Sequence, residues 1–185
     1  MGKSQPQHKS SHQSDLITTN EGLAALLDSF ESAPFLAIDT EFMREHTYYA
    51  QLCLIQISDG KRAAAIDPLA DGIDLAPLWA LMARTDITKI FHAAHQDLEI
   101  FLKEMGSLPL PLFDSQIAAM VLGHGDQVGY DRLVRGVLNI EIDKSSRFTD
   151  WSRRPLSDRQ ISYALDDVIH LAAMYPMLTE QLEQR

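Results

Sequence analysis

The residues of this 185-residue chain that could do chemistry are four carboxylates and one tyrosine. Asp39 and Glu41 form an acidic pair at the end of an apolar segment, and Asp97 lies near the middle of the chain. Tyr163 and Asp167 form a late Tyr-x-x-x-Asp pattern. Hard divalent cations require oxygen ligands, and two such ions close together require carboxylates from several segments. The five residues therefore predict a two-metal phosphodiesterase, which makes the chain a candidate nuclease.

The acidic pair lies on a predicted strand, residues 35–42. Asp39 and Glu41 are two positions apart, so on a strand their side chains leave on the same face. The alternative is a strand end that turns into solvent, where an acidic pair is tolerated. Taken alone, the Asp-x-Glu pattern is weak evidence for a site.

Asp97 falls in the first turn of a predicted helix, residues 96–105. Unpaired N–H groups and the helix dipole favour an acid there, so a structural role would suffice to explain it. His92 and His95 suggest zinc, but they straddle the junction between a strand and this helix. Because no third and fourth ligands lie nearby in the sequence, we expect no zinc site.

Tyr163 and Asp167 lie on a long predicted helix that begins at Ser157 with a capping box. They are four positions apart and therefore share one face. The buried stripe of this helix is expected to consist of Ile161, Leu165, Val168, Ala172 and Tyr175. Since both residues lie away from that stripe, they should face a cleft or solvent. Asp166 is the competing carboxylate, but it is rotated further from Tyr163.

The composition predicts one globular domain and restricts its function. The net charge is −10 with 45% hydrophobic residues, which argues against a basic nucleic-acid coating protein and leaves a metal-dependent enzyme open. Residues 1–14 are expected to be a disordered polar tail and residues 15–185 the globular domain. Cys53 is the single cysteine and is expected to be buried in a strand. With no signal-peptide core or membrane span apparent, we expect a cytoplasmic protein that does not contact membranes.

The order of predicted elements indicates an α/β fold built on a mixed sheet. The predicted strands are residues 35–42, 51–58, 62–67 and 88–91. The predicted helices are residues 23–30, 75–82, 96–105, 113–122 and 130–137, followed by the helix from Ser157.

The five residues together resemble the ribonuclease D group of the DEDD exonucleases, in the subclass with a tyrosine in its third motif (DEDDy). The likeness extends to residues 47–57, 92–99 and 144–171, and it covers about residues 20–180. It implies a ribonuclease H-like mixed β-sheet flanked by helices, forming a single 3′-5′ exonuclease domain. The implied substrate is the 3′ end of single-stranded RNA, tRNA precursors included, with nucleoside 5′-monophosphates as products.

The sister subclass uses histidine in place of this tyrosine, and His92 with Asp97 has its spacing. That alternative requires a middle acid between Glu41 and His92, and it leaves Tyr163 and Asp167 without a role. Its possible middle acids are Asp67, Asp71, Asp74 and Asp86. The tyrosine subclass therefore fits better.

The resemblance also implies roles for the site residues. Asp39 would bridge two divalent ions, Mg²⁺ or Mn²⁺. Glu41 and Asp167 would complete the site that binds the attacking water, and Asp97 would support the second ion directly or through water. Tyr163 would orient the nucleophile, because the ordinary pKa of tyrosine is about 10; a role as base stays open.

Substrate contacts follow from residue type and position. Phe42 could stack on the terminal base, or it could be an ordinary core aromatic. His92 could contact a phosphate. Candidates for tracking the RNA backbone, with a solvated surface loop as the alternative, are the basic residues Lys144, Arg147, Arg153 and Arg154.

Two other functions remain open from the sequence. A 3′-5′ exonuclease acting on single-stranded DNA is one, because recognition of the 2′-hydroxyl depends on backbone placement. A catalytically inactive nucleic-acid-binding module is the other, although a binder has no need to concentrate acids near phosphates. Ribonuclease D continues into C-terminal helical domains, whereas this sequence ends at Arg185; we therefore expect either a short form or a truncated one. Nothing in the sequence suggests an obligate dimer, so a monomer is expected.

Overall fold

The protein is built on one six-stranded mixed sheet, and its computed structural model describes residues 15–44, 49–143 and 149–185. The strand order is β1-β4-β3-β2-β5-β6. The neighbours β2–β3 and β3–β4 are antiparallel, and the other pairs are parallel. The strands are β1 (Leu16–Ile17), β2 (Phe35–Met43), β3 (Gln51–Ser58), β4 (Ala63–Ile66), β5 (Thr88–Phe91) and β6 (Leu112–Asp114).

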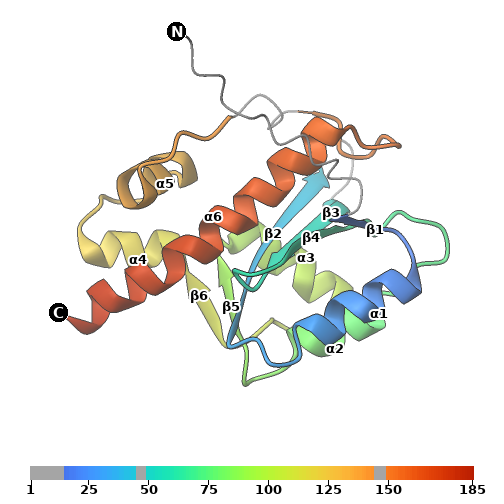
Figure 1. The fold of residues 1–185 in the computed structure, drawn as a ribbon, viewed down its shortest axis with the longest axis horizontal. Helices are drawn as coiled ribbons and strands as arrows, with labels where there is room; N and C mark the ends of the chain where they lie inside the picture. Colours follow the sequence, from blue (N-terminus) through green and yellow to red (C-terminus); the bar gives the residue numbers. More distant parts are fainter. Residues whose placement is uncertain (1–14, 45–48, 144–148) are drawn as a thin grey trace, which may run out of the picture.

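Helices cover both faces of the sheet (Figure 1). The helices are α1 (Asn20–Ser29), α2 (Ala76–Met82), α3 (His95–Met105), α4 (Ser115–Leu122), α5 (Tyr130–Leu138) and α6 (Asp158–Glu183). The first three pack on one face, and the last three gather on the other, where α6 crosses the central strands. This three-layer arrangement confirms the α/β class expected from the order of the elements.

Alternation along β2 directs its side chains to two different cores. Leu36 and Ile38 join the core under α1 and α2, whereas Ala37 joins the core under α6. By the same alternation, Asp39 and Glu41 are on the α6 face. A β-bulge falls between Glu41 and Phe42, at the point where the strand leaves the core and enters the site.

Helix α6 lies close to the sheet because the strand beneath it carries small side chains. Strand β4 presents Ala65 to α6, in a core shared with Ala164 and Leu165. The helix begins at the N-cap Ser157, and both reciprocal bonds of the capping box with Gln160 are present. The predicted start of this helix is therefore confirmed.

Two strands were missing from the sequence prediction. Strand β1 is two residues long, and β6 occupies residues that we assigned to a helix over 113–122. That helix starts two residues later, because Asp114 ends β6 and caps α4 by accepting a hydrogen bond from the Gln116 N–H. Cys53 is fully buried in β3, as expected. Among the described helices, none is long and apolar enough to cross a membrane.

Candidate active site

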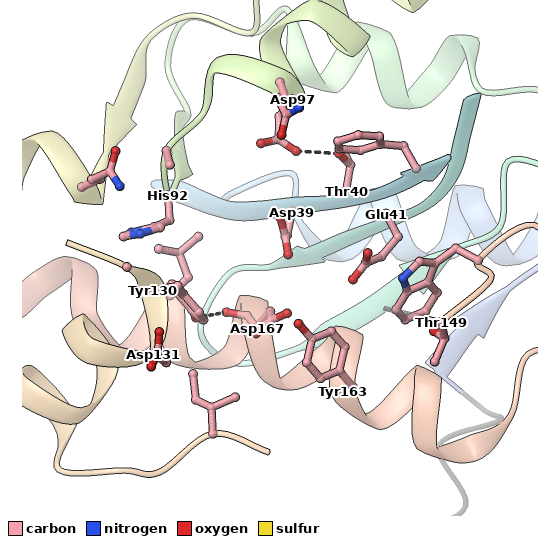
Figure 2. A pocket seen from close by; sticks show the side chains of 18 of the residues that line it. Asp39, Thr40, Glu41, His92, Asp97, Tyr130, Asp131, Thr149, Tyr163 and Asp167 are labelled. Atoms are coloured by element: carbon pink, nitrogen blue, oxygen red, sulfur yellow. Dashed lines mark hydrogen bonds between the residues drawn. The ribbon is translucent and has the colours of Figure 1, made fainter. Parts of the chain in front are cut away.

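Three carboxylates meet where β2 passes beneath α6. Asp39 and Glu41 from β2 and Asp167 from α6 each offer an oxygen, and these atoms lie within 4.8 Å of one another. Figure 2 shows the three side chains pointing toward one another from the strand and the helix. The expected convergence of the acidic pair with the late aspartate is therefore present. Clustered carboxylate oxygens are the donor set that a hard divalent cation prefers, so this group fits such an ion.

Tyr163 lies one helical turn before Asp167, and both line the same cleft. Asp167 is buried, whereas Asp166 is exposed on the outer side of α6. The choice of Asp167 over Asp166 therefore agrees with the structure. The ring of Tyr163 packs beside the buried Trp151, with centroids 6.2 Å apart.

Asp97 approaches the site from the opposite face of β2. It lies in the first turn of α3, as expected, and it is buried. The hydroxyl of Thr40 donates a hydrogen bond of 2.5 Å to Asp97 Oδ1, drawn as a dashed line in Figure 2. Thr40 stands between the two acids of β2 and points the other way, so the strand itself links the fourth carboxylate to the cluster.

The proximity of these acids perturbs their ionisation. Burial raises the pKa of Asp39 well above its usual value, and the charges of Asp97, Asp167 and Glu41 raise it further. Burial also raises the pKa of Asp97 to about 6, although the hydrogen bond from Thr40 opposes the shift. Ionised carboxylates so close together repel one another, and a bound cation would remove that repulsion.

The cleft around these acids has a volume of about 870 Å³. The start of α5 forms part of its wall, and there the hydroxyl of Tyr130 donates a hydrogen bond to the backbone carbonyl of Asp167. Burial raises the pKa of Tyr130 well above its usual value, and the nearby carboxylates of Asp167 and Asp39 raise it further. Tyr130 is therefore a neutral hydroxyl that fixes α5 against the helix that carries Asp167.

Asp114 fixes the turn that leads into α3. Its two carboxylate oxygens accept hydrogen bonds from the N–H groups of Ala93 and Ala94, each at 3.0 Å. Ala93 has a φ of 54°, a backbone conformation that costs free energy for a residue other than glycine. The paired bonds to Asp114 compensate for this cost, and they set the direction in which α3 presents Asp97.

His92, expected to contact a phosphate, lies in the wall of the cleft. Its Nδ1 pairs with the Ser115 hydroxyl at 2.9 Å, and its ring packs edge-on against Tyr130 with centroids 5.2 Å apart. Burial lowers the pKa of His92, and the charge of Asp114 opposes this shift. The imidazole is therefore neutral at pH 7, so any phosphate contact would be a neutral hydrogen bond.

Phe42 and Arg44 line the cleft at the end of β2. Phe42 is partly buried and also packs on the main core. The ring therefore both lines the cleft and belongs to the core, the two roles that the sequence left as alternatives. Arg44 is exposed and pairs with Glu99 of α3 at 2.9 Å. Among the described residues that line the cleft, Arg44 is the one lysine or arginine.

The basic residues predicted to contact the RNA backbone differ in their surroundings. Arg154 directs all its guanidinium N–H groups into the protein, toward the Asp67 carboxylate and toward backbone carbonyls of Cys53, Trp151 and Arg153. The structure therefore gives Arg154 a structural role rather than the phosphate contact we predicted. Arg153 is exposed beside it. Lys144 and Arg147 lie outside the described residues.

The ion pair between Arg154 and Asp67 is evidence against the histidine-subclass alternative. Asp67, one of its possible middle acids, is buried against Arg154. None of Asp67, Asp71, Asp74 and Asp86 is among the described residues that line the cleft, whereas Tyr163 and Asp167 both are. The geometry therefore favours the tyrosine subclass.

Sequence reasoning missed several residues that build the site. Thr40 and Asp114 hold Asp97 and its helix, Tyr130 holds Asp167, and Arg44 supplies positive charge. The alternation of side chains along β2 could have indicated Thr40, because it directs this polar residue to the face opposite Asp39 and Glu41, where a polar partner would be needed. The position of Asp114 three residues before an apolar helical stretch was compatible with a helix cap, but nothing linked it to α3.

Comparison with known proteins agrees with this geometry. Residues 15–183 match the sequence profile of a family described as 3′-5′ exonuclease. The chain belongs to this family. Within it, ribonuclease D of Zymomonas mobilis is 57% identical over 171 residues, which cover 92% of this chain and 44% of that protein. The chain thus spans less than half the length of this relative.

Solved structures of exonucleases extend the comparison. Ribonuclease D of Escherichia coli superimposes with a TM-score of 0.87 at 43% identity, covering 91% of this chain and 45% of that one. NrnC of Brucella melitensis, solved with bound Mg²⁺, has a TM-score of 0.76 at 31% identity, covering 85% of this chain and 77% of that one. Another structure of NrnC was solved with pGG bound. The expected ribonuclease D-like exonuclease fold is confirmed by these similarities.

Proposed function

We propose that this chain is a metal-dependent 3′-5′ exoribonuclease that removes nucleoside 5′-monophosphates from the 3′ ends of single-stranded RNA. The resemblance to ribonuclease D adds transfer RNA precursors to the proposed substrates, and the ribonuclease D of Escherichia coli is described as involved in structured RNA processing. The observation that carries the proposal is the meeting of Asp39, Glu41 and Asp167 within 4.8 Å in an open cleft. A nucleic-acid-binding module would gain nothing from three acids at the place where phosphates must approach.

The donor set suits two divalent cations, Mg²⁺ or Mn²⁺. When bound, such ions lower the pKa of a coordinated water and stabilise the charge that develops on the phosphate and on the leaving 3′ oxygen. Asp39 lies between the Glu41/Asp167 side of the cleft and the side that holds Asp97, which suits it to bridge two ions. Glu41 and Asp167 would complete one ion site, and Asp97 would support the other, directly or through water.

Tyr163 would orient the attacking water. Its place on the cleft wall, one turn from Asp167 and against Trp151, fixes the ring beside the carboxylates. A phenol hydroxyl can direct a water molecule through a hydrogen bond without acting as its base. This chain would thus position the nucleophile with Tyr163 and Glu41.

The walls of the cleft would hold the RNA end. Phe42 offers a ring for the terminal base, and Arg44 and Arg153 offer charge for backbone phosphates. His92 would contact phosphate as a neutral group. Recognition of RNA over DNA would depend on a contact to the 2′-hydroxyl.

A time course on end-labelled oligonucleotides tests the proposal. The substrates are 5′-labelled and 3′-labelled single-stranded RNA, the matching DNA, and a pGG dinucleotide, each with Mg²⁺, Mn²⁺ or EDTA. The expected result is a ladder shortened one nucleotide at a time from the 3′ end of RNA, with 5′-monophosphates as products. EDTA and Asp39→Ala should each abolish the ladder.

Other outcomes separate the alternatives. Faster shortening of DNA than of RNA would show that the enzyme is an exodeoxyribonuclease and not the proposed exoribonuclease. Internal fragments, or shortening from the 5′ end, would contradict the exonuclease polarity. Oligonucleotide binding without cleavage under either metal would make the chain a binding module.

A further inference from the structure

Gln56 is a buried polar residue whose side chain lacks hydrogen bonds. The residue is 0% exposed. Neither its Oε1 nor its Nε2 has a partner among the residues that the structure describes. A buried amide without partners destabilises a fold, and native proteins retain few such groups. An apolar side chain of the same shape would suit this position better if stability were its only purpose.

The register of the sheet places Gln56 beside the candidate metal site. It lies on β3 directly opposite Asp39 of β2, and its neighbour on the other side is Ala65 of β4. Directly opposite residues on antiparallel strands point to the same face, with Cβ atoms about 4.5–5.5 Å apart. Gln56 therefore lies under α6 on the face that carries the carboxylate of Asp39.

Along β3 and across to β4, the neighbours of Gln56 offer few other polar partners. Its neighbours two positions along the strand are Leu54, which belongs to the apolar core under α6, and Ser58, whose hydroxyl accepts a hydrogen bond from the Gly60 N–H. Ala65 has no polar side-chain atom. The carboxylate of Asp39 is thus the charged acceptor directly across the strand pair from this amide.

We propose that Gln56 is a positioning residue for Asp39, donating an amide N–H to the Asp39 carboxylate once divalent cations are bound. Carboxylates that bridge metal ions are commonly held by a further hydrogen bond, and loss of that bond typically weakens metal affinity or activity 10–100-fold. The amide is neutral, so it orients the carboxylate without competing with the cations for its charge. This inference rests on the proposed function, because it assumes that Asp39 binds metal.

The substitution Gln56→Met tests the inference, since methionine has nearly the same length and no hydrogen-bonding amide. In EDTA the variant should melt at a higher temperature than the wild-type protein, because the unpaired buried amide is gone. In Mn²⁺ it should bind the metal about 10–100-fold more weakly, measured by isothermal titration calorimetry and by the electron paramagnetic resonance signal of free Mn²⁺. The opposite signs of these two changes are the signature of positioning.

Ser58→Ala is the matched control, because Ser58 lies on the same strand and face but its hydroxyl already accepts a hydrogen bond from Gly60. It should lower the melting temperature and leave Mn²⁺ affinity unchanged. Wild-type Mn²⁺ affinity and kcat in Gln56→Met would overturn the role of Gln56 and leave the exonuclease proposal standing. Failure of the wild-type protein itself to bind Mn²⁺ would overturn both.

Discussion

Thr40 Oγ1 donates a 2.5 Å hydrogen bond to Asp97 Oδ1, and this bond joins the two faces of the sheet at the candidate site. Asp39 and Glu41 flank Thr40 on β2 but point toward α6, whereas Thr40 points toward α3. A single strand therefore supplies two candidate metal ligands on one face and fixes a third acid on the other. Three consecutive polar residues of β2 therefore provide two acids of the site and hold a third.

Replacing Thr40 with valine tests whether its hydrogen bond to Asp97 supports the activity of the site. Thr40→Val keeps the shape of the side chain but removes the donor, so the pKa of Asp97 should rise further above its present value of about 6. We expect activity with Mn²⁺ to fall about 10–100-fold. Thr40→Ser retains the hydroxyl and should keep most of the activity in the same assay. A larger loss in Thr40→Ser than in Thr40→Val would mean that packing of the threonine methyl group, not the bond, supports the site.

Asp39→Asn should stabilise the metal-free protein and inactivate it. The pKa of Asp39 is raised by burial and by three neighbouring acids, which means that its ionised form is unfavourable in the fold without a cation. Asparagine removes that charge, so the melting temperature in EDTA should increase. Stabilisation by added Mn²⁺ should disappear, and kcat should fall by roughly 10²-fold or more. A variant that melts lower in EDTA and still gains stability from Mn²⁺ would contradict a metal site at Asp39.

Two adjacent arginines should behave differently when each is changed to alanine. The partly buried Arg154 forms a bidentate pair with the buried Asp67, with contacts of 2.6 Å, whereas Arg153 is exposed. Arg154→Ala leaves a buried carboxylate without its partner and should cost about 3–5 kcal/mol in the free energy of unfolding. Arg153→Ala should change stability by less than about 0.5 kcal/mol and raise KM for RNA.

Urea unfolding and steady-state kinetics on both variants check this contrast. Arg154→Lys is the control for charge, because it keeps the cation but cannot form the bidentate contact, and it should remain destabilised. A stable Arg154→Ala protein with weakened RNA binding would contradict the structural role and indicate that Arg154 contacts the RNA backbone, as the sequence predicted.

The contrast between these arginines also shows what the sequence could reveal. The local excess of basic residues was visible in the sequence. The partner of Arg154, however, is Asp67, which lies 87 positions earlier in the sequence, directly after β4. Pairings at that separation depend on the tertiary arrangement, which residue patterns alone do not fix. Asp39, Glu41 and Asp167 were predictable because each combines a residue type with a local period of two or four, whereas Asp97 has no site residue at such a spacing.

Secondary structure followed the same rule. Strand β3 was predicted with its observed bounds, because a long apolar stretch ends at Asp59-Gly60. Strand β6 was missed because its three residues run directly into α4, and a short apolar segment next to a helix is easily taken as its first turn. The hydrogen bonds that place β6 come from its parallel neighbour β5, so they are nonlocal.

Lys89 should give the stability of the protein a dependence on alkaline pH. Its ammonium is fully buried and donates to the backbone carbonyls of Arg84, Ile87 and Leu110, and burial lowers its pKa to about 8. The unfolded chain holds this proton up to the ordinary value near 10.5. Between these two values the unfolded state binds more protons, so folding becomes more favourable as pH rises.

Comparison with Lys89→Met isolates this effect. The free energy of unfolding of the wild-type protein should rise relative to the variant by on the order of 1–2 kcal/mol between about pH 8 and pH 10.5, because the carbonyl acceptors favour the charged form and limit the shift. Urea midpoints across this range measure the difference. A difference between the two proteins that stays constant with pH would show that the carbonyls keep the pKa of Lys89 at its ordinary value.

Arg44 and Glu99 should affect RNA binding with opposite signs. Their contact of 2.9 Å is exposed, with side chains 41% and 48% accessible, and such pairs contribute about 0.2–1 kcal/mol. A phosphate can therefore displace Glu99 at small cost, and Arg44 would then contact the RNA backbone beside the cleft. Arg44→Ala should raise KM roughly tenfold, because a charge-assisted hydrogen bond contributes about 1.5–3 kcal/mol. Glu99→Gln should lower KM by about two- to fivefold at low salt, because it releases Arg44.

The double variant decides whether these two effects share one origin. If Glu99 acts by holding Arg44, Glu99→Gln should have no effect on KM when Arg44 is already alanine. The gain from Glu99→Gln should also shrink as salt rises from about 0.01 M to 0.15 M, since exposed charges are screened over that range. A gain that persists in the Arg44→Ala background would instead assign the effect to the general negative charge of Glu99 near the RNA, with Arg44 playing no part.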